Sequence, residues 1–400
     1  MFENIIGQSG VVDHLTEEIR KQKLPHSLFF YGDQYSGKLT TALELSRVLT
    51  CEEGSAAWNC TCRQCNVQRL LTHQSTIMLG SRYFSNEITA SADVLKRTEK
   101  RFARYLLVRA VRKLTRRFDD FLWEGNENKI KKVYGIVQEL ESNIAEIEPN
   151  QNNTLKKETV ENIVSLSKEI ASSVNLETIP IDLIRKVSYW AHTTAGDTKK
   201  IIIIENAQKM LESARNALLK ILEEPPANVY FVLIAPRKGA LISTILSRLR
   251  HYYFVGRDQK SSGEVLKKIF REDPEKYPAL RDYFLAWSEQ SRDLVSAQAN
   301  QFMKLLLVRE RTLTVDRSLA EICDQLKNKG RSELLLEELL MVIRAMVKEQ
   351  LPTSEETSVL LAVAEKWKQL IADTYQQIDL YNQNPSFAIE SLFYKMQVSI

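Results

Sequence analysis

Residues 27–40 have the sequence SLFFYGDQYSGKLT, in which a short apolar strand is followed by a glycine loop and the start of a helix. Gly32, Gly37 and Lys38 have the spacing of a P-loop, whose backbone N–H groups and helix N-terminus bind phosphates. Glycine-lysine loops also arise by chance, but the strand before this loop and the helix after it supply the context that a P-loop requires. The stretch therefore predicts a nucleotide-binding type of α/β fold.

The residues that would hold Mg²⁺ beside this loop depart from an ATPase pattern. A P-loop lysine is normally followed by Ser or Thr, whose hydroxyl binds the metal, but here Leu39 follows and the hydroxyl comes at Thr40. Residues 199–206, KKIIIIEN, predict a buried strand ending in Glu205 and Asn206, where an ATPase places acids that bind metal and activate water. Asparagine cannot act as a base, so we expect a degenerate site for ATP and Mg²⁺, or simply a solvated strand end.

Four short apolar runs alternate with helical sequence, which predicts a parallel sheet with helices on both faces. The runs are rich in β-branched or aromatic residues and lie at 27–31, 201–204, 229–234 and 252–255. After Val255 the pattern is helical, so the last third of the chain is predicted to be all α.

Residues 83–176 interrupt this alternation with long charged helices, which we interpret as an inserted helical hairpin. From Lys96 to Arg117 the segment contains ten Lys or Arg residues and a single Glu. Such a helix could follow a DNA backbone or dock a partner, but its basic positions lie mostly off the apolar stripe. The favoured interpretation is a solvated face.

Four of the five cysteines lie close together in the sequence, and they are Cys51, Cys60, Cys62 and Cys65. Four thiolates suffice for tetrahedral zinc, whereas exposed free thiols would be prone to oxidation. The first pair after Cys51 is spaced more tightly than a usual knuckle, so a neighbour such as His73 could replace one ligand. We predict a structural Zn²⁺ site, because four ligands leave no position open for water. Cys323, alone in a helical pattern, is predicted to fill the core.

The composition is that of an ordinary soluble chain. It has 400 residues, 44% hydrophobic and 26% charged, so about two to four domains are expected. A formal net charge of +4 is too small to indicate a nucleic-acid binder. The sequence has neither a leader-like N-terminus nor an apolar stretch long enough to cross a bilayer, so we expect a cytoplasmic protein with no membrane partner.

Several motifs occur in the order found in the AAA+ clamp-loader subunits of bacterial DNA polymerase III, and the chain resembles that family. The strongest similarity lies in residues 214–226, ARNALLKILEEPP, which resemble the family's signature helix and turn. Residues 244–248, TILSR, resemble its serine-arginine motif, although Leu249 replaces the usual cysteine. The other similar segments are residues 5–8 (IIGQ), 24–26 (LPH), 291–293 (SRD), 381–385 (YNQNP) and 388–390 (AIE).

The resemblance implies an AAA+ P-loop domain at residues 1–255, with a zinc module at 51–65 and the helical insertion at 83–176. A helical lid at 256–308 and a helical collar at 309–400 would follow. The insertion itself matches no part of the family. The family assembles as a hetero-pentameric ring that opens a sliding clamp and places it on primed DNA, with ATP bound between neighbouring subunits.

By the same resemblance, Arg248 would be an arginine finger that completes the ATP site of a neighbour. An arginine can stabilise phosphoryl charge in trans without an intact site on its own subunit. Arg292 would lie in the sensor-2 region, and the sensor-1 threonine position is occupied by Ala235.

The leading hypothesis is therefore a non-hydrolysing, delta-prime-like subunit, because Leu39 and Asn206 weaken this chain's own site. One alternative is an active motor subunit of the gamma/tau type, in which Thr40 replaces the missing hydroxyl and Glu205 alone holds Mg²⁺. Another is a zinc-containing nucleic-acid-binding protein that uses the basic helix.

Overall fold

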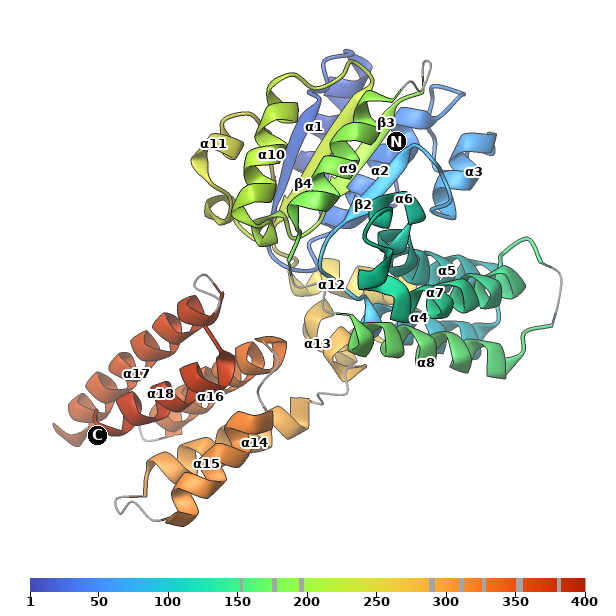
Figure 1. Ribbon diagram of the computed structural model, residues 1–400. Helices are drawn as coiled ribbons and strands as arrows, with labels where there is room; N and C mark the ends of the chain where they lie inside the picture. Colours follow the sequence, from blue (N-terminus) through green and yellow to red (C-terminus); the bar gives the residue numbers. More distant parts are fainter. Residues whose placement is uncertain are drawn as a thin grey trace. The chain divides into compact units, whose positions relative to one another are not determined.

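The computed structural model describes residues 1–151, 154–174, 178–193, 198–287, 292–308, 313–325, 329–349, 355–379 and 383–399. The chain divides into two compact units, Met1–Trp287 and Ser288–Ile400, whose elements are labelled in Figure 1. This division falls inside the predicted lid, because residues 256–287 pack with the first unit. The domain boundaries at 255 and 308 stay predictions.

The first unit is built on a five-stranded parallel sheet with the strand order β2-β3-β4-β1-β5. Its strands are β1 (Ser27–Gly32), β2 (Thr76–Leu79), β3 (Lys200–Ile204), β4 (Val229–Ala235) and β5 (Arg250–Phe254). The parallel sheet is confirmed, and it contains an edge strand, β2, that the sequence pattern does not predict. Because β1 lies between β4 and β5, the glycine loop leaves from the interior of the sheet, where open α/β sheets bind their ligands.

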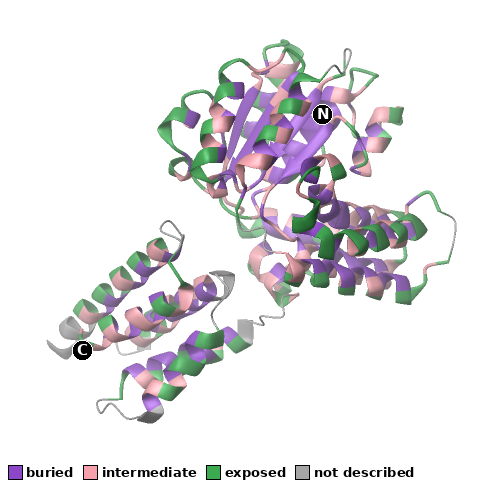
Figure 2. Cartoon of the chain, in the orientation of Figure 1, coloured by how far each residue is buried: buried purple, intermediate pink, exposed green. Residues whose placement is uncertain are grey.

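Helices cover both faces of the sheet (Figure 1). Those on one face are α9 (Ile181–His192) and α10 (Glu212–Glu223), and those on the other are α1 (Ser9–Arg20) and α2 (Lys38–Thr50). Phe29, Ile202 and Phe231 are fully buried, as the purple strands of Figure 2 illustrate. Burial on both faces is the physical reason for the near-continuous apolar runs of these strands.

The insertion between β2 and β3 is a bundle of four main helices, where the sequence pattern predicts a hairpin. They are α4 (Ser85–Thr98), α5 (Arg101–Thr115), α7 (Glu127–Ile147) and α8 (Lys157–Ser173), with η1 (Arg116–Phe118) and α6 (Asp120–Trp123) between α5 and α7. Helix α4 packs on α5 and α8, and α7 packs on α8. The bundle forms because each amphipathic helix needs a partner for its apolar face.

All regular elements among the described residues after β5 are helices. The first unit ends with α12 (Gln259–Val265), η4 (Leu266–Phe270), η5 (Pro274–Lys276) and α13 (Leu280–Ala286). The second unit consists of α14 (Arg292–Leu306), α15 (Leu313–Gln325), α16 (Lys329–Glu349), α17 (Glu355–Asp379) and α18 (Pro385–Gln397). Its core includes Phe302 and Phe393, whose rings meet edge to face with centroids 5.1 Å apart. Among the described helices, none is long and apolar enough to span a bilayer.

Candidate nucleotide and metal sites

The glycine loop joins β1 to the N-terminus of α2, as the sequence predicts. Gly32 has a φ of +142°, and a Cβ there would lie 2.0 Å from the carbonyl oxygen of Phe254 in β5. Gly37 caps α2 with a φ of +99°, which glycine adopts without strain. This strand-loop-helix geometry is the one that presents backbone N–H groups to a phosphate.

Lys38 folds back onto the loop. Its ammonium donates to the carbonyl oxygens of Gly32, at 2.5 Å, and of Asp33, and to the hydroxyl of Ser36 at 3.2 Å. Burial lowers the pKa of Lys38 to about 8, although Asp33 and Glu205 favour its charged form. The lysine therefore lies where a P-loop needs it, bonded to the oxygens of its own loop.

The position of the magnesium-binding hydroxyl is apolar. Leu39 is 7% exposed and belongs to the core, whereas Thr40 lies on the exposed side of α2. The hydroxyl of Thr41 is buried and donates to the carbonyl of Gly37 at 3.0 Å. Successive helix positions are about 100° apart, so a hydroxyl at Thr40 does not take the direction of one at residue 39. The geometry disfavours Thr40 as a substitute ligand.

Arginines hold the carboxylate at the end of β3. Glu205 is buried, and its oxygens accept hydrogen bonds from Arg117 at 2.5 Å and from Arg82 at 3.4 Å. Asn206, with a φ of +54°, donates to the hydroxyl of Ser81 at 3.1 Å. The two guanidinium groups supply at Glu205 the positive charge that a metal ion supplies in an ATPase.

A larger cluster surrounds these arginines, of which Arg117 is buried and Arg82 is partly exposed. Phe84 lies beneath the guanidinium carbons of Arg82 and Arg117, at 4.7 and 4.9 Å, and beneath the ammonium of Lys113 at 5.8 Å. Lys113 also forms an ion pair with Glu87. Burial acts to raise the pKa of Glu87, but Lys113 and Arg82 hold it below its ordinary value. Through this cluster, the insertion is joined to the end of β3.

The sensor-1 position also lies beside the loop. Ala235 ends β4, is buried, and pairs with Tyr31 of β1 immediately before the loop. Its assignment to the sensor-1 position stays a prediction from the resemblance. A methyl group cannot hydrogen-bond a phosphate or a water, so this position adds no catalytic group.

Arg257, which sequence reasoning does not single out, follows β5 and forms a hydrogen bond with the glycine loop that leaves the neighbouring strand β1. It donates to the carbonyl oxygens of Tyr35 at 2.8 Å and Ile6 at 2.7 Å. The ring of Tyr35 stacks on Phe284 of α13, with centroids 5.1 Å apart. Arg257 thus joins the N-terminal IIGQ motif to the P-loop. Because its acceptors are backbone carbonyls far away in the sequence, no spacing rule reveals this role.

Arg248 follows α11 (Ser243–Leu246) and is partly exposed. Its guanidinium donates to the carbonyl of Thr244 at 2.7 Å and pairs with Glu223 of α10 at 2.5 Å. The serine-arginine motif and the signature helix are thereby brought together. An ion pair between partly exposed groups is weak, so Arg248 can exchange Glu223 for another anion at small cost.

The remaining predicted positions lie partly outside the described residues. Ser291 and the side chain of Arg292 are among them, as are Tyr381 and Asn382, so the sensor-2 assignment stays a prediction. In α18, Ala388 and Ile389 are buried.

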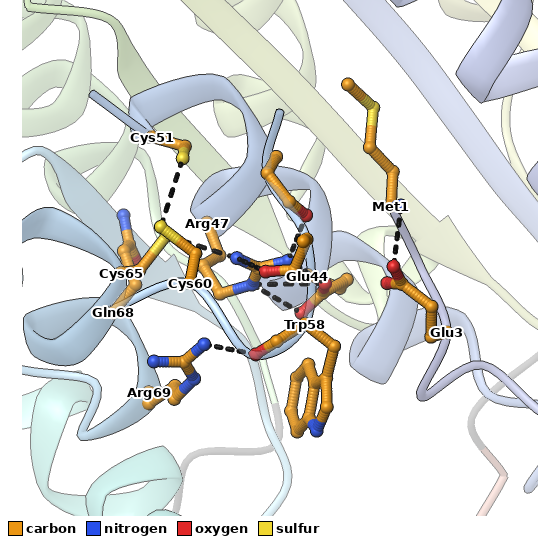
Figure 3. Close-up of polar contacts among 12 residues, drawn as sticks. Met1, Glu3, Glu44, Arg47, Cys51, Trp58, Cys60, Cys65, Gln68 and Arg69 are labelled. Carbon is orange, nitrogen blue, oxygen red and sulfur yellow. Dashed lines mark hydrogen bonds and ion pairs between the residues drawn. The ribbon is translucent and has the colours of Figure 1, made fainter. Parts of the chain in front are cut away.

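The predicted cysteines come together beside α3 (Arg63–Arg69). The sulfur atoms of Cys51, Cys60, Cys62 and Cys65 all lie within 4.8 Å of one another. Those of Cys51 and Cys60 are 3.8 Å apart. Zinc bonds of about 2.3 Å in a tetrahedron place the sulfurs about 3.8 Å from each other, so the donor set and its size fit a bound zinc ion. Figure 3 shows part of this cluster beside Arg47.

His73 takes no part in this cluster. Its Nε2 lies 2.8 Å from Oε1 of Gln64, and its Nδ1 accepts from the backbone N–H of Ser75 at 3.0 Å. Both ring nitrogens are engaged, so the suggestion that His73 replaces a cysteine is wrong.

The basic segment is solvated only in part: Arg97, Lys100 and Arg101 are exposed, as expected. The arginines further along α5 and in η1 face inward, which corrects the expectation for that part. Arg109 donates to the carbonyl of Arg69 at 2.7 Å, and Arg112 to that of Leu70 at 3.1 Å. These carbonyls belong to the C-terminus of α3, which favours cations because its carbonyls lack helical partners. Arg116 donates to the carbonyl of Thr76 at 2.8 Å. These arginines dock the insertion on the end of α3 and on β2, so their charge is used within the protein.

These features define a P-loop type of α/β domain, with a cysteine cluster after its loop helix and helices after its sheet. The sequence profile of the family described as "DNA polymerase III, delta subunit" matches residues 7–118 and 114–257. These ranges include the insertion, so the expectation that the insertion matches no part of the family is wrong. The chain belongs to this family, and the resemblance to clamp-loader subunits is confirmed.

Individual relatives match shorter stretches. The DNA polymerase III subunit delta' of Haemophilus influenzae is 33% identical over 97 residues, 24% of this chain and 30% of that protein. The delta' subunit of Buchnera aphidicola subsp. Schizaphis graminum is 45% identical over 74 residues, 18% of this chain and 23% of that protein. The subunit tau of Salmonella typhimurium is 34% identical over 92 residues, 23% of this chain and 14% of that protein. Each match thus covers less than a third of the relative's length.

Proposed function

We propose that this chain is a delta-prime-type subunit of a clamp loader, which acts by assembly and by lending Arg248 to a neighbour, and which does not hydrolyse ATP. The observation that supports this most is the state of its own metal site. Leu39 is apolar at the hydroxyl position, and Glu205 is paired with Arg117 and Arg82. Hydrolysis of ATP needs a metal ion and a group that positions water.

The proposed partners are those of the family: other subunits in a hetero-pentameric ring, the sliding clamp, and primed DNA reached through the complex. Arg248 supports the role of donor, because it is partly exposed and lies next to the signature helix α10. Glu223 would hold the guanidinium in place until a neighbour's nucleotide replaces it. A finger of this kind stabilises the charge that develops on the transferred phosphoryl group.

The test is the DNA- and clamp-stimulated ATPase rate of a reconstituted loader that carries Arg248→Ala in this chain. We expect the site that Arg248 completes to lose on the order of 10³-fold in rate, while the other sites keep theirs. Arg250→Ala is the matched control, because Arg250 lies two residues further on and pairs with Glu18 at 3.4 Å. An unchanged rate in a loader that still assembles would refute the finger.

The enzyme alternative, an active gamma/tau-type motor, predicts ATP hydrolysis by this chain at its own loop. The buried side chain of Leu39 and the arginine-bound Glu205 disfavour it. The two hypotheses can be separated with a loader in which the P-loop lysine is replaced in every other ATPase subunit, while this chain keeps Lys38. Hydrolysis in that loader would support the motor, and its absence supports the delta-prime type.

The second alternative, a zinc-containing nucleic-acid-binding protein, needs cations that can reach phosphates. Arg109, Arg112 and Arg116 donate instead to carbonyl oxygens of the protein. The alternative predicts salt-dependent DNA binding by the chain alone. We propose that zinc at the cysteine cluster has a structural role, because four protein ligands complete its coordination.

A further inference from the structure

Arg47 occupies the interior of the protein in the last turn of α2, the helix that begins at the P-loop lysine. It is only 1% exposed. A guanidinium carries five N–H donors, and leaving such donors unpaired in the interior costs free energy. The contacts of Arg47 therefore indicate what the residue is there to hold.

Each of the five donors has an acceptor (Figure 3). The Nε group donates to Glu44 at 3.1 Å, and Nη2 donates to Glu44 at 2.6 Å and to the carbonyl of Ala56 at 2.7 Å. The Nη1 group donates to the carbonyl of Ala57 and to Sγ of Cys65, both at 3.1 Å. One side chain thus joins α2, the loop between the first two cysteines, and the sulfur of a third.

The loop that Arg47 holds has a strained point. Ala56 is fully buried and has a φ of +45°, a left-handed conformation that costs a non-glycine residue about 1–2 kcal/mol. Its carbonyl is one of the acceptors of Arg47. The ring of Trp58 covers the guanidinium carbon at 5.7 Å from the ring centroid. The contacts fix the course of the chain from Cys51 to Cys60.

We propose that Arg47 is the positioning residue of the metal site formed by Cys51, Cys60, Cys62 and Cys65, and that it acts through its N–H···S bond to Cys65. This inference rests on the metal site included in the proposed function. Cys65 is the buried member of the cluster, and a buried thiolate is unfavourable unless a donor stabilises it. Donors outside the ligand shell also orient the ligands, and their loss weakens metal binding.

Arg47 is expected to affect zinc binding through its directed hydrogen bond to Cys65 and not through its positive charge. Glu44 is buried beside Arg47 and balances it, so the pair is neutral as a whole. The bond also links metal binding to α2, because Glu44 and Arg47 are both residues of that helix. Metal binding therefore stabilises the helix that carries the P-loop lysine at its start.

The experiment measures the affinity of the purified full chain for zinc, by competition with a chromophoric chelator, in the unchanged protein and in Arg47→Gln. We expect binding to weaken by about 10- to 100-fold. Arg47→Lys is also expected to bind zinc more weakly than the unchanged chain, because an ammonium has three donors in place of five. Should Arg47→Gln not fold, Arg47→Lys carries the measurement.

Arg69→Gln is the matched control. Arg69 lies over the same indole ring, 5.5 Å from its centroid, but donates to Asn66 and to the backbone carbonyl of Trp58 instead of to a cysteine. Its zinc affinity should stay within about twofold of the unchanged chain, well below the loss that follows removal of a true outer-shell partner.

A second readout separates positioning from simple packing. Zinc raises the free energy of unfolding in proportion to the logarithm of its concentration over its Kd, so a positioning residue changes the stability gained on adding zinc. A residue that only packs would lower stability equally with and without zinc and leave the affinity unchanged, and that outcome overturns the proposal. Failure of the unchanged chain to bind one zinc ion also overturns it, without bearing on the Arg248 experiment, which measures ATP hydrolysis.

Discussion

Arg117 neutralises a carboxylate at the position where an ATPase holds its metal. The pair with Glu205 is nearly fully buried, with side-chain exposures of 2% and 7%. The sequence predicts the place of Glu205 at the strand end, but its partner lies 88 residues away, inside the insertion. An apolar run shows where a strand ends, but it does not predict which distant cation will pair with the carboxylate at that end.

Removal of Arg117 should therefore destabilise the first unit strongly. Breaking one partner of a buried ion pair costs about 3–5 kcal/mol, because the other charge stays buried. In urea unfolding, Arg117→Ala should lose stability in this range, reduced by the share that Arg82 retains. The double variant Arg117→Ala with Glu205→Gln should lose less than the single one, since no unpaired carboxylate remains. A double variant that loses as much stability as Arg117→Ala, or more, would contradict this account of the pair.

At the scale of elements, the sequence predicts those that have long periodic patterns. Where the structure differs from the prediction, the cause is local. The strands β1, β3 and β4 are predicted because both faces of each are buried, whereas β5 is an edge strand in which Tyr252 and Phe254 are buried and Tyr253 is exposed. Strand β2 has only four residues, too few for a pattern to stand out, and the insertion has more helices than its stripe suggests. The motifs place the loop and the cysteines correctly. The contacts of Arg109, Arg112 and Arg116 follow from tertiary packing alone. Their acceptors are backbone carbonyls, which every residue has, so the sequence does not show which carbonyl will accept.

The turn between η1 and α6 should make stability depend on pH. Burial raises the pKa of Asp119 from 3.8 to about 6, although Arg116 opposes the shift. Between these values the folded protein holds a proton that the unfolded chain has lost, so stability falls as pH rises from about 4 to about 6. Asp119→Asn should remove this slope and be more stable at pH 7 by on the order of 1–2 kcal/mol, less the lost ion pair with Arg116. The measurement is urea unfolding at several pH values, and the control is Asp120→Asn, because Asp120 is exposed. If the free energy of unfolding had the same pH slope in all three proteins, the assignment to Asp119 would be contradicted.

At the scale of the whole molecule, the chain consists of two compact units that have separate cores. The first unit contains the P-loop, Arg248 and the cysteine cluster, and one continuous apolar core runs through its sheet and its insertion. The second unit has its own core, in which the indole N–H of Trp367 donates to the carbonyl of Met396 at 3.0 Å. Separate cores imply units that unfold as separate cooperative transitions.

Residues 1–287 should therefore fold without the rest of the chain, bind one zinc ion, and unfold at the same urea midpoint as the corresponding transition of the full chain. The physical reason is that the buried apolar groups of the sheet and the insertion find their partners within this unit. If the second unit contains the oligomerisation collar, the same fragment should fail to enter a reconstituted loader, as measured by size-exclusion chromatography with the other subunits. A fragment that is unfolded alone would contradict the independence of the first unit. A folded fragment that assembles as well as the full chain would instead place the ring contacts within residues 1–287 and remove the collar role from the second unit.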